Sequence, residues 1–155
     1  MKEIAKSKYG KYVIREPIDD KYEPPFPPKG RPIPNFPPFL HFFGEKYCKE
    51  ANVMISLMCI TEPFLMREDP HSHDVDKYMC FLGGNPVEIR DFGAEVELYL
   101  GEEGERYLID TPTMVYVPKG LIHNPLNFKR IDKPIMFMDI TVTPKCTADP
   151  IFNQP

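Results

Sequence analysis

Residues 70–84 read PHSHDVDKYMCFLGG, and residues 118–127 read PKGLIHNPLN. The first stretch alternates through His71, His73 and Lys77 and stops at a glycine pair, which is typical of a β-strand. Side chains two residues apart share one face of a strand, so both imidazoles could bind one metal ion. His123 follows a tight P-x-G turn about fifty residues later. In an antiparallel barrel, strands that distant in sequence can face each other across the interior.

Short β-type segments continue on both sides of these stretches. They predict strands over 52–64, 71–82, 95–100, 106–109, 114–117 and 135–142, with a further edge strand over 11–15 and a short helix near 45–50. Gly101 and Gly104 mark a hairpin between the third and fourth of these strands. Residues 85–94 are predicted to form a loop. Many short strands separated by turns favour an all-β sandwich or barrel.

A proline-rich segment precedes this β region. Nine of the 19 prolines lie between Pro17 and Pro38, where a helix or a central strand is excluded because proline lacks an N–H and fixes φ. Apolar side chains are interleaved with these prolines: Tyr22, Phe26, Ile33, Phe36, Phe39 and Leu40. Disordered segments are typically poor in aromatic residues. We therefore expect an arm that packs on its own barrel or crosses onto a partner subunit in a homodimer.

The charge and the cysteines narrow the class of protein further. A net charge of −4 argues against a nucleic-acid partner, because phosphate binding requires clustered cations. We expect no membrane partner and a cytoplasmic location, since the sequence has neither a signal peptide nor a long apolar run. The cysteines are Cys48, Cys59, Cys80 and Cys146, and they contain no C-x-x-C pair. Reduced thiols are therefore favoured over disulfides.

The two quoted stretches resemble the paired motifs of the cupin superfamily. Residues 70–84 are similar to the first motif, G-x5-H-x-H-x3,4-E-x6-G. Residues 118–127 match the second motif at Pro118, Gly120, His123 and Asn127. The resemblance implies a cupin-type double-stranded β-helix, or jelly-roll barrel. We expect an arm over 1–48, the barrel over 49–145 and a C-terminal tail over 146–155. The resemblance also implies a metal ion bound by His71, His73 and His123.

One departure from the cupin pattern concerns the chemistry of the site. The position of the first motif's glutamate holds Lys77, which strand alternation places on the same face as the two histidines. Three arrangements remain open. Water could complete a three-histidine shell, Lys77 could lie at the centre of a metal-poor site, or another carboxylate could replace the glutamate. The candidate carboxylates are Glu97, Asp76 and Asp139.

The resemblance leaves two classes of function. One is an enzyme acting on a small oxygen-rich or carbonyl substrate by dioxygenation, isomerisation, decarboxylation or hydrolysis. In that enzyme Lys77 would act as a proton donor or an anchor for an oxyanion, and Tyr116, like Tyr78 and Tyr99, is a candidate donor near the site. The other class is a sensor or storage barrel that binds a small ligand without converting it. Three neutral imidazoles suit Zn, Fe(II), Ni, Cu or, less well, Mn.

Two further expectations concern side chains near this site. His41 lies among aromatic residues and is predicted to pack rather than to bind metal. Several of the eight methionines fall on predicted strands, and some of them are expected to line a cavity that accepts a partly apolar ligand.

Overall fold

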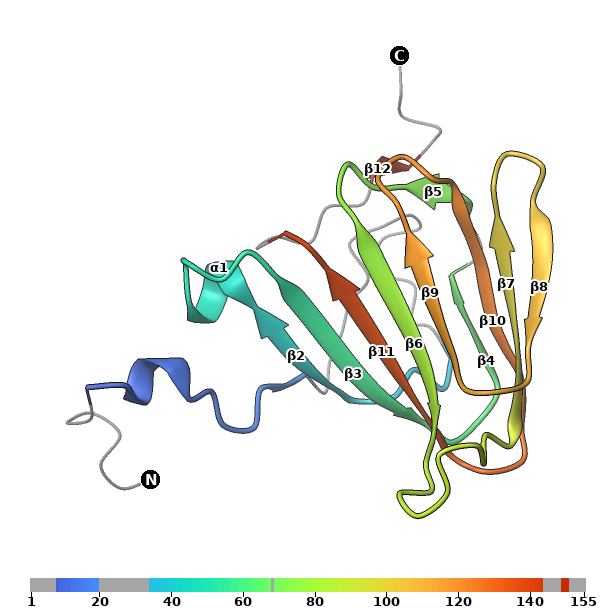
Figure 1. Ribbon diagram of the computed structural model, residues 1–155, viewed down its shortest axis with the longest axis horizontal. Coiled ribbons are helices and arrows are strands. Elements are labelled where there is room, and N and C mark those ends of the chain that lie inside the picture. The colour runs from blue at the N-terminus through green and yellow to red at the C-terminus, as the bar shows by residue number, and fades with distance from the viewer. Residues whose placement is uncertain (1–7, 20–33, 68, 144–148, 151–155) are drawn as a thin grey trace.

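The architecture is a pair of antiparallel β-sheets, seen in a computed structural model that describes residues 8–19, 34–67, 69–143 and 149–150. The first sheet contains six strands in the order β1-β2-β3-β11-β6-β9. Their bounds are β1 Ile18–Asp19, β2 Phe39–Phe43, β3 Met54–Ile60, β6 Lys77–Gly83, β9 Thr113–Val117 and β11 Ile135–Thr141. In Figure 1 the strands β2, β3, β11, β6 and β9 lie side by side in this order.

The second sheet runs in the order β12-β5-β10-β7-β8, and β4 also pairs with β10. Its strands are β4 Phe64–Arg67, β5 His71–Ser72, β7 Ala94–Leu100, β8 Glu105–Ile109, β10 His123–Ile131 and β12 Asp149–Pro150. Two short helical turns complete the described elements: a 3₁₀ turn over Gly10–Tyr12 and α1 over Gly44–Tyr47. No helix among the described residues is long and apolar enough to cross a membrane.

The hydrophobic core fills the space between the sheets. Phe81 on β6 and Phe137 on β11 come from the first sheet, and both rings contact the ring of Phe128 on β10. All three residues have no exposed surface. Inward residues alternate with outward ones along each strand, so each sheet has one apolar face. On β11 the inward-facing side chains are the apolar Ile135 and Phe137, followed by the polar Asp139 and Thr141.

The predicted all-β class is confirmed, together with most of the strands. The hairpin over β7 and β8 forms around Gly101 and Gly104, which both adopt positive φ angles. The predicted strand over 71–82 is divided into β5 and β6, because residues 73–76 form a bend. The edge strand predicted over 11–15 is wrong, since a 3₁₀ turn occupies residues 10–12 and pairing starts at β1.

The proline-rich segment is described only in part. Tyr22, Phe26 and Ile33 lie outside the described residues. Phe36 contacts the rings of Phe39 and Phe64, so this end of the segment packs on its own barrel. β2 lies within the 1–48 range assigned to the arm, and it pairs with β3 along its whole length.

The cysteines that the structure describes are Cys48, Cys59 and Cys80, and all three are free thiols. Cys146 lies outside the described residues. For these three positions the prediction of reduced thiols is confirmed.

Candidate metal centre

Three imidazoles converge at one end of the sandwich, as the sequence predicts. His71 opens β5, His123 opens β10, and the two residues are direct partners in the ladder between these strands. His73 lies two residues beyond His71, in the bend before β6. One ring nitrogen from each histidine lies within 4.8 Å of the others. The nitrogens are therefore close enough to converge on one ion, with a small inward shift of the rings to reach ligand distances of about 2.0–2.1 Å.

Backbone carbonyl groups hold two of the rings in place. Nδ1 of His71 lies 3.0 Å from the carbonyl oxygen of Asp69, and Nδ1 of His123 lies 3.0 Å from that of Leu121. Because a carbonyl oxygen can only accept, each Nδ1 carries the hydrogen and each Nε2 keeps its lone pair. Nε2 of His123 is buried without a hydrogen-bond partner. A buried, unpaired imidazole lone pair is what a metal ligand offers, so these residues fit a metal ion.

The environment also keeps these two rings neutral. Burial, aided by the positive charge of Arg67, lowers the pKa of His71 to about 3. Burial, together with the nearby Lys77 ammonium, lowers the pKa of His123 to about 2. Only a neutral imidazole has a lone pair to donate to a metal ion, so the ligand form of both rings dominates at pH 7.

Hydrogen bonds join the two segments that carry the histidines. The N–H of Gly120 donates to the carbonyl oxygen of His73 at 2.8 Å. The carboxylate of Asp76 accepts from the N–H of Lys119 at 3.0 Å and from the hydroxyl of Tyr116 at 3.1 Å. Gly120 has a φ of +82°, a conformation that glycine adopts without strain. The P-x-G turn is therefore fastened directly to the H-x-H segment.

A cavity of about 110 Å³ opens beside the imidazoles. His71 and His73 line it, together with the side chains of Lys77, Asp139 and Asn124. The rest of the wall is mainly apolar and includes Phe36, Phe39, Met54, Met58, Met66, Met79 and Leu126. Its volume is below the ~300–1,000 Å³ of sites for drug-sized ligands, so it suits a molecule of only a few non-hydrogen atoms.

Lys77 forms an ion pair inside this cavity. Its Nζ lies 2.9 Å from Oδ2 of Asp139, and the two side chains are only 12% and 18% exposed. Lys77 therefore faces the cavity, as strand alternation predicts. Of the three carboxylates proposed to replace the missing glutamate, Asp139 lines the cavity and contacts this lysine instead.

Comparisons with known proteins find a structural likeness only. No family model and no curated protein sequence matches this chain. Among solved structures, an oxalate decarboxylase of Bacillus subtilis, described for its Mn(II) centres, superimposes with a TM-score of 0.50. The two are 11% identical over 77% of this chain and 30% of that one. An oxalate oxidase in complex with the substrate analogue glycolate gives a TM-score of 0.52 at 10% identity, over 76% of this chain and 56% of that one.

The chain has the cupin fold. The resemblance predicted from the two histidine-bearing stretches is thereby confirmed at the level of architecture. The chain covers about a third of the decarboxylase's length and just over half of the oxidase's. At identities this low, the likeness establishes the fold and leaves the reaction to be argued from the site.

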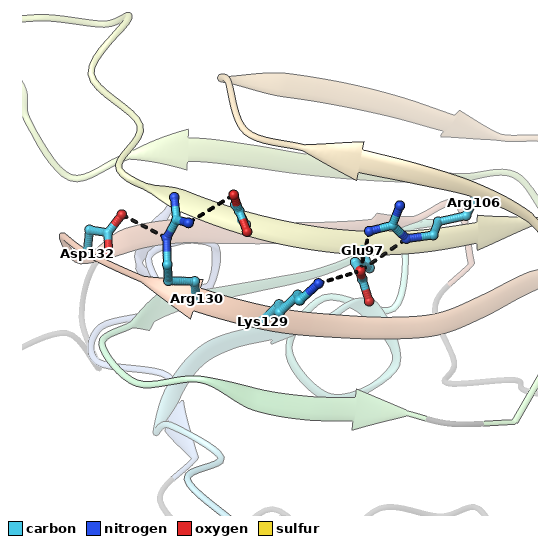
Figure 2. Close-up of polar contacts among 6 residues, drawn as sticks. Glu97, Arg106, Lys129, Arg130 and Asp132 are labelled. Atoms are coloured by element: carbon cyan, nitrogen blue, oxygen red, sulfur yellow. Dashed lines mark hydrogen bonds and ion pairs between the residues drawn. The ribbon is translucent and has the colours of Figure 1, made fainter.

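Glu97 does not join the three histidines. Its neighbours Val96 and Leu98 point into the core, so Glu97 points to the outer face of β7. There its carboxylate accepts from Arg106 and from Lys129, the latter at 3.2 Å (Figure 2). Hydrogen bonds from these cations, Arg106 foremost, hold the pKa of Glu97 below its usual range. The expectation that Glu97 supplies a fourth ligand is corrected by this placement.

Tyr116 and Asp76 are also found away from the imidazoles. Tyr116 is 53% exposed on the outer face of β9, and its ring stacks on Tyr78. The cavity is lined by neither tyrosine. A catalytic role for Tyr116 therefore does not fit the structure, because its hydroxyl contacts Asp76 on the outer surface. Asp76 fastens the P-x-G turn and is not in the group of three histidines.

His41 and Ser56 are members of the cavity wall that sequence reasoning did not identify. His41 packs against Phe39 and Phe43, as predicted, and its ring also faces the cavity. β2, β3 and β11 pair in register, so His41 lies opposite Ser56 and Ser56 lies opposite Asp139. This polar row crosses three adjacent strands on the inner face of the first sheet. Only the strand register reveals it.

Proposed function

We propose that this cupin is a divalent-metal-dependent enzyme that acts on a small oxygen-rich or carbonyl substrate. The observation that carries the proposal is the convergence of three imidazoles beside a small, partly apolar cavity. His71, His73 and His123 would hold the ion. Its chemistry when bound would be that of a Lewis acid, which polarises a substrate oxygen.

The protein's own groups have separate roles in this proposal. The backbone carbonyls of Asp69 and Leu121 orient two of the rings, and the hydrogen bond between Gly120 and His73 holds the two segments together. The Lys77 ammonium has three N–H donors and uses one of them on Asp139. The other donors can hold an anionic substrate oxygen near the imidazoles or give it a proton.

A cation in place of the usual glutamate supports catalysis over storage. The protein supplies neutral rings and a compensated Lys77–Asp139 pair, so a bound dication would keep its full charge for the substrate. The apolar wall excludes water, which strengthens each of these interactions. The structural neighbours, which are oxalate decarboxylase and oxalate oxidase, are enzymes with this fold, and they support the same reading.

The first test is the metal content of protein purified without chelator or nickel resin. Inductively coupled plasma mass spectrometry should find close to one transition-metal ion per chain. His71→Ala, His73→Ala and His123→Ala should each lose most of it, whereas His41→Ala, also in the cavity wall, should keep it. Equal metal content in all four variants would contradict the site.

The second test separates an enzyme from a binding protein. The metal-loaded parent should convert at least one member of a panel of small hydroxy, keto and dicarboxylic acids, as followed by NMR. Tight binding of a panel member that is recovered unchanged would favour the sensor or storage barrel instead.

A further inference from the structure

The cavity contains polar groups that a metal shell does not account for. Oδ2 of Asp139 contacts Lys77, but its other oxygen, Oδ1, is buried and has no hydrogen-bond partner among the described residues. Leaving a buried acceptor unpaired costs stability, and the cost is larger for a charged group. Such a group needs a donor from something that enters the cavity.

The position of Asp139 in its sheet shows that this is a built feature. Asp139 follows Ile135 and Phe137 on the inner face of β11, where the next residue inward would ordinarily be apolar. Ser56 and His41 continue the same row across β3 and β2, and each is only 7% exposed. A buried polar group on the core face of a sheet costs stability unless it has a hydrogen-bond partner, and Oδ1 of Asp139 has none among the described residues.

The cavity also presents a cation and an apolar surface to the same ligand. Lys77 contacts Asp139 and lines the same cavity as His71 and His73. Phe36, Met54 and Met58 form part of the apolar wall. A ligand that satisfies all these groups has an anionic oxygen, a hydroxyl hydrogen to donate and a short apolar portion.

We propose that the substrate is a small hydroxy acid, recognised by Lys77 through its carboxylate and by Asp139 through its hydroxyl. This inference rests on the proposed metal-dependent function, because the carboxylate would also approach the imidazoles. Lys77 donates to the carboxylate, and Oδ1 of Asp139 accepts from the hydroxyl. The carbon chain lies against the methionines and Phe36. Asp139 is then the residue that determines specificity, since an acid without the hydroxyl leaves its carboxylate oxygen unpaired.

The test uses three probes on the metal-loaded full chain: 2-hydroxybutanoate, butanoate and glycolate. Isothermal titration calorimetry gives their dissociation constants, and the metal content of each sample is measured in parallel. The parent should bind 2-hydroxybutanoate at least tenfold more tightly than butanoate, which lacks the hydroxyl. It should also prefer 2-hydroxybutanoate to glycolate, which lacks the apolar portion.

Two variants locate the source of the preference. Asp139→Asn keeps the volume but removes the charged acceptor, and it should reduce the preference for the hydroxyl to less than threefold with the metal retained. Glu95→Gln makes the same change of charge on the outer face, where Glu95 pairs with Arg130, and it should preserve the preference. If Asp139→Asn fails to fold, the comparison of probes on the parent still decides.

The outcomes distinguish this inference from the proposed function. A parent that takes up metal but binds 2-hydroxybutanoate and butanoate equally overturns the hydroxy-acid assignment alone. An Asp139→Asn variant that folds, holds metal and keeps the full preference also overturns it. A parent that takes up no metal overturns both proposals.

Discussion

Replacing Lys77 by methionine should make the metal-free protein less stable. It should also increase the stabilisation that the protein gains when it binds metal. Methionine keeps most of the apolar stem of lysine but removes the ammonium that Asp139 contacts at 2.9 Å. Removing one partner of a fully buried pair costs about 3–5 kcal/mol, because the other charge is left uncompensated. With side chains 12% and 18% exposed, water screens part of that cost, so we expect a loss of about 2–3 kcal/mol.

The effect on metal binding has the opposite sign. The ammonium repels a dication at the imidazoles. The repulsion energy is roughly 3 kcal/mol for these charges about 10 Å apart at an effective dielectric constant of about 20. The substitution removes this repulsion and exposes the Asp139 carboxylate to the ion. Even half of that change corresponds to about a tenfold gain in affinity. Metal should therefore raise the stability of Lys77→Met by more than it raises that of the parent.

Thermal unfolding with excess chelator and with excess Zn²⁺ measures both effects. In chelator the midpoint of Lys77→Met should fall by about 5–10 °C, because 1 kcal/mol shifts a domain of this size by about 2–4 °C. Lys129→Met is the matched control: Lys129 also contacts a glutamate, at 3.2 Å, but is 52% exposed, so its loss should cost under about 1 kcal/mol. Equal midpoints for Lys77→Met and the parent would show that the pair is not buried as described. Equal stabilisation by Zn²⁺ would show that Lys77 does not face the ion.

Three further outcomes follow from the same structure. Without metal, the free energy of unfolding should fall as the pH drops below about 6.5, because histidines in the unfolded chain bind protons there, whereas folded His71 and His123, with pKa values of about 3 and 2, stay neutral. Urea unfolding in chelator should show a loss of about 4 kcal/mol by pH 5. A stability that does not change with pH would contradict the buried neutral rings. Asp76→Ala should weaken Zn²⁺ binding about tenfold in a competition titration, since the carboxylate holds the P-x-G turn, whereas Glu88→Ala, an exposed loop carboxylate, should leave it unchanged. Light scattering should find a dimer for the parent and a monomer for the double variant Tyr22→Ser, Phe26→Ser if the arm supplies the interface; a dimer of unchanged strength would assign the arm to its own barrel.

The cluster of three histidines could be predicted from the sequence because the residues that define it lie in two short motifs. The H-x-H pair, the P-x-G turn and the spacing between them identify the three ligands without any knowledge of the strand order. The face of Lys77 was also predicted correctly, although a bend over 73–76 interrupts the expected strand. The bend leaves Lys77 on the inner side, where it lines the same cavity as the two histidines.

The errors come from residues whose positions depend on the rest of the sheet. Glu97 lies between Val96 and Leu98, and those apolar neighbours turn inward, which forces the carboxylate outward. Asp139 follows Phe137 by two residues and is turned inward by the same rule. The choice between the two carboxylates thus depended on which of their neighbours are buried. His41 and Ser56 meet Asp139 only through the pairing of β2, β3 and β11, which the sequence does not specify.

Among the strands that the sequence did not predict, β10 is the one that carries a candidate ligand. β10 is the longest described strand and carries His123, but it contains Pro125 close to its start. Proline lowers the expectation of a central strand because it cannot donate to the ladder. The strand accommodates it at an irregular register between His123 and Leu126. The alternation of Leu126 and Phe128 beyond that point was the remaining signal of a strand.

The direct pairing of His71 with His123 has a consequence for how the proposed metal site would be loaded. The two ligands come from strands that are joined only after the intervening β6–β9 segment has been made and folded. A nascent chain that has emerged only as far as His73 offers two imidazoles and holds an ion weakly. Because such long-range contacts form late, the complete set of ligands exists only in the finished barrel. If the proposed site takes up an ion, the choice among competing metals is therefore made by the complete set of three histidines, after synthesis and at the ion concentrations of the compartment where folding ends.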